Sequence, residues 1–212
     1  MSKSLIVKRI EGLSSKDNYS DVVLALKDVP WHAIDQSPWL ADYPYEPKAT
    51  FQIAYTATHI VIHYDIQEEF VKAQYIRPNE NVWEDSCVEF FLSLDGKQHY
   101  YNFEFNVLGT GLIGYGPAVK SLRSRLTAEQ IEQVDVLTQV RKIGGIKQWN
   151  SILFIPIALF DGVSLAGNTF HGNFYKCGDG LPNPHFVAWN NIDLPSPSFH
   201  QPSFFGELRF EP

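Results

Sequence analysis

The chain has 212 residues, of which 44% are hydrophobic and 19% charged, and its formal net charge is −7. This length suits one domain with a substantial core, so we expect residues 1–212 to form a single, monomeric domain. The negative charge argues against nucleic acid and anionic membranes as partners, since both attract basic surfaces. The sequence shows no secretory leader and no membrane span, so we expect a cytoplasmic protein unless a leader has been removed.

Alternating apolar and polar residues predict strands from residue 51 onward. Residues 51–56 and 60–66 predict one hairpin, and residues 85–95 and 100–107 predict a second, which turns at Asp95-Gly96. The expected buried face of the second hairpin consists of Val88, Phe90, Leu92, Leu94, Tyr101, Phe103, Phe105 and Val107.

The second hairpin is followed by glycines that spell G-x-G-x-x-G at Gly109, Gly111 and Gly114. A dinucleotide-binding loop with this pattern needs a helix that starts at the second glycine. Gly114, Gly116 and Pro117 would break such a helix within two turns. We therefore expect a strand end and a wide turn that requires positive φ, and no nucleotide cofactor.

The remaining elements complete an all-β pattern. Thr127-Ala-Glu-Gln130 predicts one short helix with a capping box, and Ile131 and Val134 would face inward. Further strands are expected at 151–159, 169–175, 186–189 and 206–210. Together they predict an all-β fold, an antiparallel two-sheet β-sandwich of the jelly-roll or immunoglobulin-like kind with one short helical insertion.

One face of the second hairpin is polar. Tyr100, Asn102, Glu104 and Asn106 lie opposite its buried residues, and Glu89 accompanies them on the partner strand. A solvated outer face explains this pattern equally well. The functional alternative is sugar recognition, because fixed carboxylates and amides bind hydroxyl groups while aromatic rings stack on the apolar face of a sugar.

Two blocks carry a resemblance to a known family. "NVWEDSCVEFFLSLDG" with "YYNFEFNVLGT", and the later "VAWNNIDLPSPSFHQPSFFGELRF", resemble the family 9 carbohydrate-binding modules and their stand-alone relatives of the DOMON-type β-sandwich superfamily. The resemblance implies non-catalytic binding of a small saccharide or a polysaccharide end, such as xylan, in carbohydrate catabolism. The sugar would lie between two aromatic side chains, and neighbouring polar groups would bind its hydroxyls.

The resemblance assigns candidate binding residues. The first aromatic position falls on Trp83 and the second, a tryptophan in the family, on Phe199. The acidic partner falls on Glu89. Glu104 stands where the family has an arginine, which alters the hydroxyls that can be bound. The same strand contributes Asn102 and Asn106.

Further candidates have structural alternatives. Trp189 suits a core position better than a ligand platform. Lys176, Asp179 and Asn173 belong to a turn-rich segment from which one side chain is expected to line the site. Arg77 could replace the missing guanidinium, although pairing with nearby acids explains it too.

Other chemistries have less support. Glu89 and Glu104 could form the acid and base of a glycoside hydrolase. A degenerate DOMON-type domain could bind another small ligand, but haem with a methionine ligand is difficult because Met1 is the only methionine. Cys87 and Cys177 are expected to be free thiols. We expect no cofactor and no metal: structural calcium occurs in the family, but no D-x-D-x-D-G loop is present.

Overall fold

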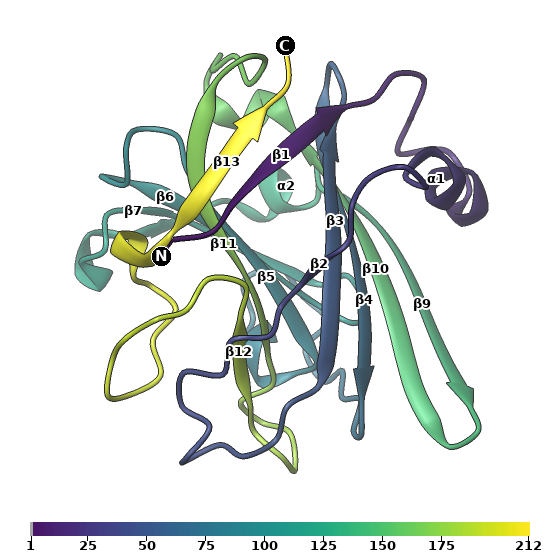
Figure 1. Ribbon diagram of the computed structural model, residues 1–212, viewed down its shortest axis with the longest axis vertical. Helices are drawn as coiled ribbons and strands as arrows, with labels where there is room; N and C mark the ends of the chain where they lie inside the picture. The colour runs from purple at the N-terminus through teal and green to yellow at the C-terminus, as the bar shows by residue number, and fades with distance from the viewer. Residues whose placement is uncertain (1) are drawn as a thin grey trace.

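The computed structural model describes residues 2–212, and most of its regular structure is strand (Figure 1). Two hydrogen-bonded sheets share one strand and so form a single curled sheet. The first sheet has the order β8 (Ser124–Arg125), β7 (Gly111–Gly116), β6 (Tyr100–Asn106), β5 (Cys87–Ser93), β11 (Thr169–Cys177), β13 (Gly206–Phe210) and β1 (Ser4–Arg9). The second continues from β1 through β3 (Lys48–Tyr55), β4 (His59–Glu68), β10 (Ile146–Pro156) and β9 (Asp135–Ile143). Two short strands pair at the side, β12 (Phe186–Ala188) with β11 and β2 (His32–Ala33) with β3.

Strand β1 joins the two sheets. Its residues 4–7 pair in parallel with β13, and residues 8–9 pair in parallel with β3. Figure 1 shows β1 and β13 side by side at the seam. The prediction of an entirely antiparallel arrangement is therefore wrong at this strand. Its apolar run is short, and its partner β13 is about two hundred residues distant, so no local turn fixed its direction.

The core between the sheets is aromatic. The ring of Phe174 on β11 stacks on Phe51 of β3, with 3.7 Å between ring centres, and on Phe90 at 4.8 Å. Both predicted hairpins are confirmed as β3–β4 and β5–β6. In the second, Phe90 lies opposite Phe103, as the alternation requires, and both side chains are buried in this core.

Helix α1 (Tyr19–Ala25) covers the outer face of the second sheet, a helix that the periodicity did not reveal. The Asn18 side chain caps it by accepting a hydrogen bond from the Asp21 backbone N–H at 3.1 Å. Val22 is fully buried against the sheet. Gln52 Nε2 donates to the carbonyl oxygens of residues 26 and 29, which follow the helix. Helix α1 and the residues after it therefore cover this outer face of β3 and β4.

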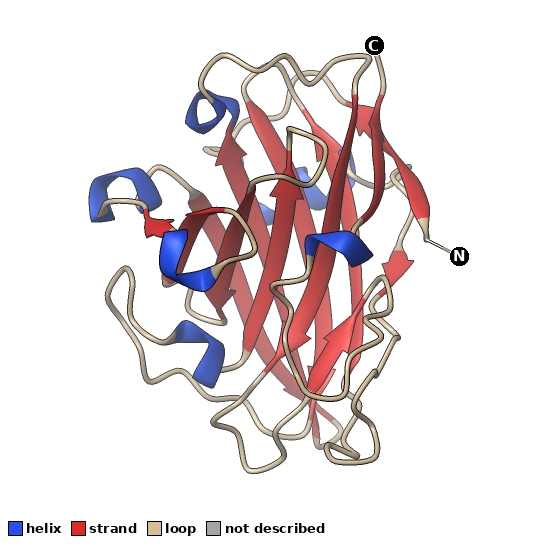
Figure 2. Cartoon of the chain, turned by 90° about the vertical axis from the view of Figure 1, so that its left-hand side faces the viewer, coloured by secondary structure: helices blue, strands red, loops and turns tan. Residues whose placement is uncertain are grey.

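The other helices are short segments between strands (Figure 2). The predicted helix is confirmed as α2 (Ala128–Ile131), with a capping box between Thr127 and Gln130. The 3-10 helices are η1 (Val82–Glu84), η2 (Lys120–Leu122), η3 (Ile157–Phe160) and η4 (Pro202–Phe204). Within residues 2–212, no helix is long and apolar enough to cross a membrane.

The glycine stretch forms a strand rather than a wide turn. Gly109 has the expected positive φ of 83°, but β7 begins only two residues later. A Cβ at Gly111 would lie 2.4 Å from a ring atom of Phe105, so glycine is needed there for close packing.

Candidate functional site

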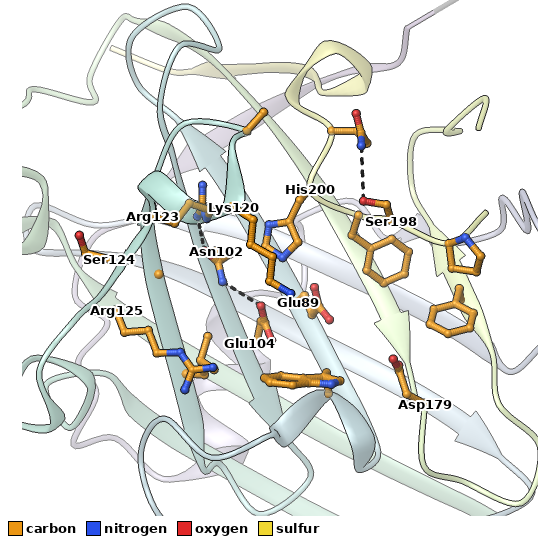
Figure 3. A pocket seen from close by; sticks show the side chains of 18 residues that line it. Glu89, Asn102, Glu104, Lys120, Arg123, Ser124, Arg125, Asp179, Ser198 and His200 are labelled. Atoms are coloured by element: carbon orange, nitrogen blue, oxygen red, sulfur yellow. Dashed lines mark hydrogen bonds between the residues drawn. The ribbon is translucent and has the colours of Figure 1, made fainter. Parts of the chain in front are cut away.

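A cavity of about 550 Å³ lies on the face of the first sheet that points away from the core. Its floor is formed by β5, β6 and β7, and the segments 118–125 and 197–201 border it (Figure 3). The lining residues are Trp83, Glu89, Asn102, Glu104, Leu112, Gly114, Ala118, Lys120, Arg123, Ser124, Arg125, Asp179, Phe186, Pro197, Ser198, Phe199, His200 and Gln201.

The floor carries a hydrogen-bonded polar chain. Asn102 Nδ2 donates to Glu104 Oε1 at 2.8 Å, and Arg123 donates to Asn102 Oδ1 (Figure 3). Glu89 lies directly opposite Glu104 in the β5–β6 register, so both carboxyl groups lie on the same face. Asn102, Glu104 and Glu89 are each no more than 5% exposed. The alternative of a simply solvated face is therefore not what the structure shows, because these polar side chains are buried.

Gly114 makes room for this chain. A Cβ at this position would lie 2.5 Å from Asn102 Oδ1. The absence of a side chain on β7 thus lets the Asn102 amide lie over the neighbouring strand. This glycine of the G-x-G-x-x-G pattern has a packing role beside the cavity.

Burial perturbs the carboxyl groups of the cavity. Burial raises the pKa of Glu104 to about 7, although the hydrogen bond from Asn102 acts to lower it. Burial also raises the pKa of Asp179 to about 6. Burial also raises the pKa of Glu89 well above its usual range, assisted by its carboxyl and thiol neighbours. The cavity floor therefore favours the neutral form of Glu89 more than water does.

Two arginines face the carboxyl groups. The guanidinium of Arg123 lies 3.9 Å from the ring centre of Tyr100 and donates to the carbonyl oxygens of residues 100, 116 and 117. Arg125 lies 6.0 Å from the ring centre of Trp83, and its Nη1 donates to the Asn79 carbonyl. The cavity therefore presents guanidinium groups from β8 and the segment before it, not from β6.

Both predicted aromatic residues line the cavity. Trp83 belongs to η1 and is half-buried, and its carbonyl accepts a hydrogen bond from the Asp179 backbone N–H at 3.1 Å. Phe199 is 8% exposed because one face of its ring stacks on Tyr175, with 4.1 Å between ring centres. The ring centre of Trp39 lies 6.0 Å from that of Phe199. Trp83 thus offers the larger aromatic surface.

Two further predicted residues lie elsewhere for structural reasons. Asn106 is fully buried, and its amide donates to Asp85 and to the Tyr75 carbonyl, so it holds the turn after β6. Arg77 is exposed, does not line the cavity, and its backbone N–H donates to Glu80.

The last two predicted residues point into the core. The ring centre of Trp189 lies 5.7 Å from that of Phe174, which favours the structural alternative. Lys176 Nζ lies between the sheets, 2.9 Å from Glu68 Oε2. Cys177, its neighbour on β11, faces the cavity side, so the two-residue alternation of the strand directs Lys176 away.

Several lining residues were missed by the sequence analysis. Of the three candidates Asn173, Lys176 and Asp179, only Asp179 lines the cavity. Arg123 and Arg125 had no sequence signal, since the edge strand β8 has two residues and pairs with β7 over only two positions. His200, whose Nδ1 lies 2.9 Å from Tyr100 Oη, belongs to the C-terminal block that resembles the family, but no pattern in that block marks it as a lining residue.

One grouping of side chains could hold a metal ion. Among residues 2–212, the ligand atoms of Cys87, Glu89 and Cys177 lie within 4.8 Å of one another. Two sulfur ligands do not suit calcium, which binds oxygen atoms. This grouping therefore does not fit the calcium that the resemblance implied.

Comparisons with known proteins agree with this architecture. A crystal structure of a "putative carbohydrate-binding protein" from Bacteroides uniformis is 38% identical, with a TM-score of 0.90 over 100% of both chains. A family 9 carbohydrate-binding module from Caldicellulosiruptor kristjanssonii, solved with glucose, shares the fold at 10% identity, with a TM-score of 0.62 over 99% of this chain and 96% of that one. The same kind of module from that organism, solved with cellotriose, has a TM-score of 0.61 at 10% identity over 99% and 94% of the two chains.

A curated relative and a family model complete the comparison. An "Extracellular protein" from Arthroderma benhamiae is 22% identical over 213 residues, which cover 90% of this chain and 91% of the relative. The model of carbohydrate-binding family 9 matches residues 18–210, nearly the whole chain. The chain belongs to carbohydrate-binding family 9.

Proposed function

We propose that this chain binds a saccharide in the cavity above β5, β6 and β7 and catalyses no reaction on it. The observation that carries the proposal is the meeting of Trp83 and Phe199 with Glu89, Asn102 and Glu104 around one cavity. An aromatic surface beside fixed donors and acceptors matches the two faces of a pyranose ring. A volume of about 550 Å³ suits a small saccharide or the end of a longer chain.

Trp83 is assigned the main stacking contact. Phe199 is assigned a smaller contact, since Tyr175 already occupies one face of its ring. Glu89 and Glu104 are assigned hydrogen bonds to the sugar hydroxyls. Arg125 is assigned the role of guanidinium donor, which the resemblance places in the family at the position of Glu104. Arg123 positions Asn102 and acts indirectly.

The preformed floor favours binding without a large rearrangement. The chain from Arg123 through Asn102 to Glu104 is already hydrogen-bonded, so little conformational entropy is lost when a sugar enters. We propose glucose and cello-oligosaccharides as the first ligands to test, with xylo-oligosaccharides as the alternative. We also propose that this chain is a monomer and that it is related to DOMON-type domains.

The glycoside hydrolase alternative has weaker support. Glu89 and Glu104 are cross-strand neighbours that share one floor, whereas hydrolase carboxyl groups flank the scissile bond from two sides. Incubation with chromogenic glycosides and polysaccharides separates the two functions. Turnover that is abolished by Glu89→Gln would establish the enzyme instead.

Calorimetric titration tests the binding proposal. We expect the wild-type chain to bind at least one of the sugars above, and Trp83→Ala to abolish measurable affinity with an unchanged circular dichroism spectrum. Trp31→Ala is the matched control, because Trp31 is 47% exposed and packs on His63 of the other sheet. Absence of binding by the wild type to these sugars and to a glycan array would refute the proposal, as would equal losses in both variants.

A further inference from the structure

The two cysteines, about ninety residues apart in sequence, meet beneath the cavity. Cys87 and Cys177 lie directly opposite each other in the β5–β11 register, and Glu89 is two residues from Cys87 on the same strand face. The two sulfur atoms and a carboxylate oxygen all lie within 4.8 Å of one another. We propose that these three side chains bind a thiophilic divalent cation of the zinc class.

The geometry needs only small adjustments. Cys177 Sγ lies 3.1 Å from Glu89 Oε1, in contact with the carboxyl group. In a tetrahedral zinc site with bonds of about 2.0–2.3 Å, neighbouring ligand atoms are roughly 3.5–3.8 Å apart. Side-chain rotations on two paired strands can therefore bring the three atoms around one ion without moving the backbone.

The ligand set selects the class of metal. Thiolate ligands favour zinc and other soft cations over magnesium and calcium. The two thiolates already balance the two positive charges of the ion in a buried place where an unpaired cation would be costly, and Glu89 adds an oxygen ligand. Burial raises the pKa of both thiols, that of Cys87 to about 11, so the ion must displace their protons.

The cavity supplies access and a fourth position. Cys87 and Cys177 are at most 1% exposed, but Glu89 lines the cavity from which a hydrated ion can arrive. Three protein ligands leave one coordination position, which a water molecule on the cavity side can fill. The proposed metal site shares Glu89 with the proposed sugar contacts, whereas Cys87 and Cys177 do not line the cavity and have no part in sugar binding.

Metal retention by the full chain tests the proposal. Wild-type protein, reduced with a phosphine, is mixed with equimolar zinc, passed over a desalting column and analysed for bound metal. We expect one zinc per chain and, with cobalt as the spectroscopic probe, a thiolate-to-metal charge-transfer absorption. Cys87→Ser and Cys177→Ser should each weaken zinc binding by at least about 100-fold.

A surface site provides the control. His99 Nδ1 lies 2.8 Å from Asp95 on the exposed β5–β6 turn, where zinc could bind adventitiously. His99→Ala should leave retention unchanged. Retention lost only in His99→Ala overturns the proposal, as does retention by both serine variants. If those variants misfold, the wild type loaded with cobalt decides: the absence of a thiolate-to-metal charge-transfer band would overturn the proposal. No sugar enters the assay, so its outcome is separate from that of the binding titrations.

Discussion

Replacement of Lys176 by methionine tests whether this residue belongs to the core rather than to the cavity. Lys176 Nζ lies 2.9 Å from Glu68 Oε2, and both side chains are fully buried. Glu68 comes from β4 and Lys176 from β11, so this pair joins the two sheets through the core. His185 Nε2 lies 2.9 Å from Lys176 Nζ, and Trp149 Nε1 donates to Glu68 Oε1 at 2.6 Å.

The expected magnitude follows from the burial of both partners. Removal of Lys176 leaves the Glu68 carboxyl without its cation, which costs about 3–5 kcal/mol in free energy of unfolding. Lys176→Met with Glu68→Gln removes both charges and keeps an acceptor for Trp149. We expect the double variant to regain at least about 2 kcal/mol of that loss, since a buried neutral pair avoids the uncompensated charge.

Urea unfolding at pH 7, followed by tryptophan fluorescence, measures these differences. Lys142→Met is the control, because Lys142 is an exposed residue of β9 and its loss should change the free energy of unfolding by less than about 0.5 kcal/mol. Lys176→Met should leave sugar affinity unchanged in the folded protein. The reasoning is refuted if Lys176→Met lies within about 1 kcal/mol of the wild type, or if it abolishes sugar binding while the fold is intact.

Two further predictions concern the cavity floor. Gly114→Ala places a Cβ against the Asn102 amide, so it should lower the free energy of unfolding by about 1.5–3 kcal/mol and weaken sugar binding. An unchanged urea midpoint together with an unchanged sugar affinity would contradict this prediction. Glu104→Gln removes a carboxyl whose pKa is raised to about 7, so the stability that its proton provides is present below the unfolded pKa of 4.5 and is lost as the pH rises to 7. The wild type should therefore lose up to about 3 kcal/mol relative to Glu104→Gln between pH 4.5 and 8 in urea titrations, and a constant difference across this range would show that Glu104 is not perturbed.

The β-rich fold was predictable where the signal was local. The hairpin formed by β5 and β6 alternates strictly, so Phe90 and Phe103 could be assigned to the core. The capping box of Thr127 and Gln130 depends on residues three positions apart. The direction of β1 could not be predicted, since it depends on pairing with a strand about two hundred residues away.

The candidate site was predictable only in part. Trp83, Phe199 and three floor residues were found through motif resemblance and strand alternation, and they line one cavity. Arg123 and Arg125 could not be predicted, because an edge strand of two residues is too short to show hydrophobic periodicity. The position of Lys176 could not be predicted from the turn-forming residues around it, because β11 extends to Cys177 and its alternation directs the lysine inward.

The position of β1 at the seam has a consequence for biosynthesis. Its hydrogen-bonding partner β13 ends at Phe210, so the seam cannot close until that residue has left the ribosome. Before then, β11 and β1 each carry an unpaired edge on which other chains could add strands. The nascent polypeptide should therefore depend on chaperones until β13 has been synthesised and can pair with β1, and truncations that remove β13 should aggregate rather than form a smaller native domain.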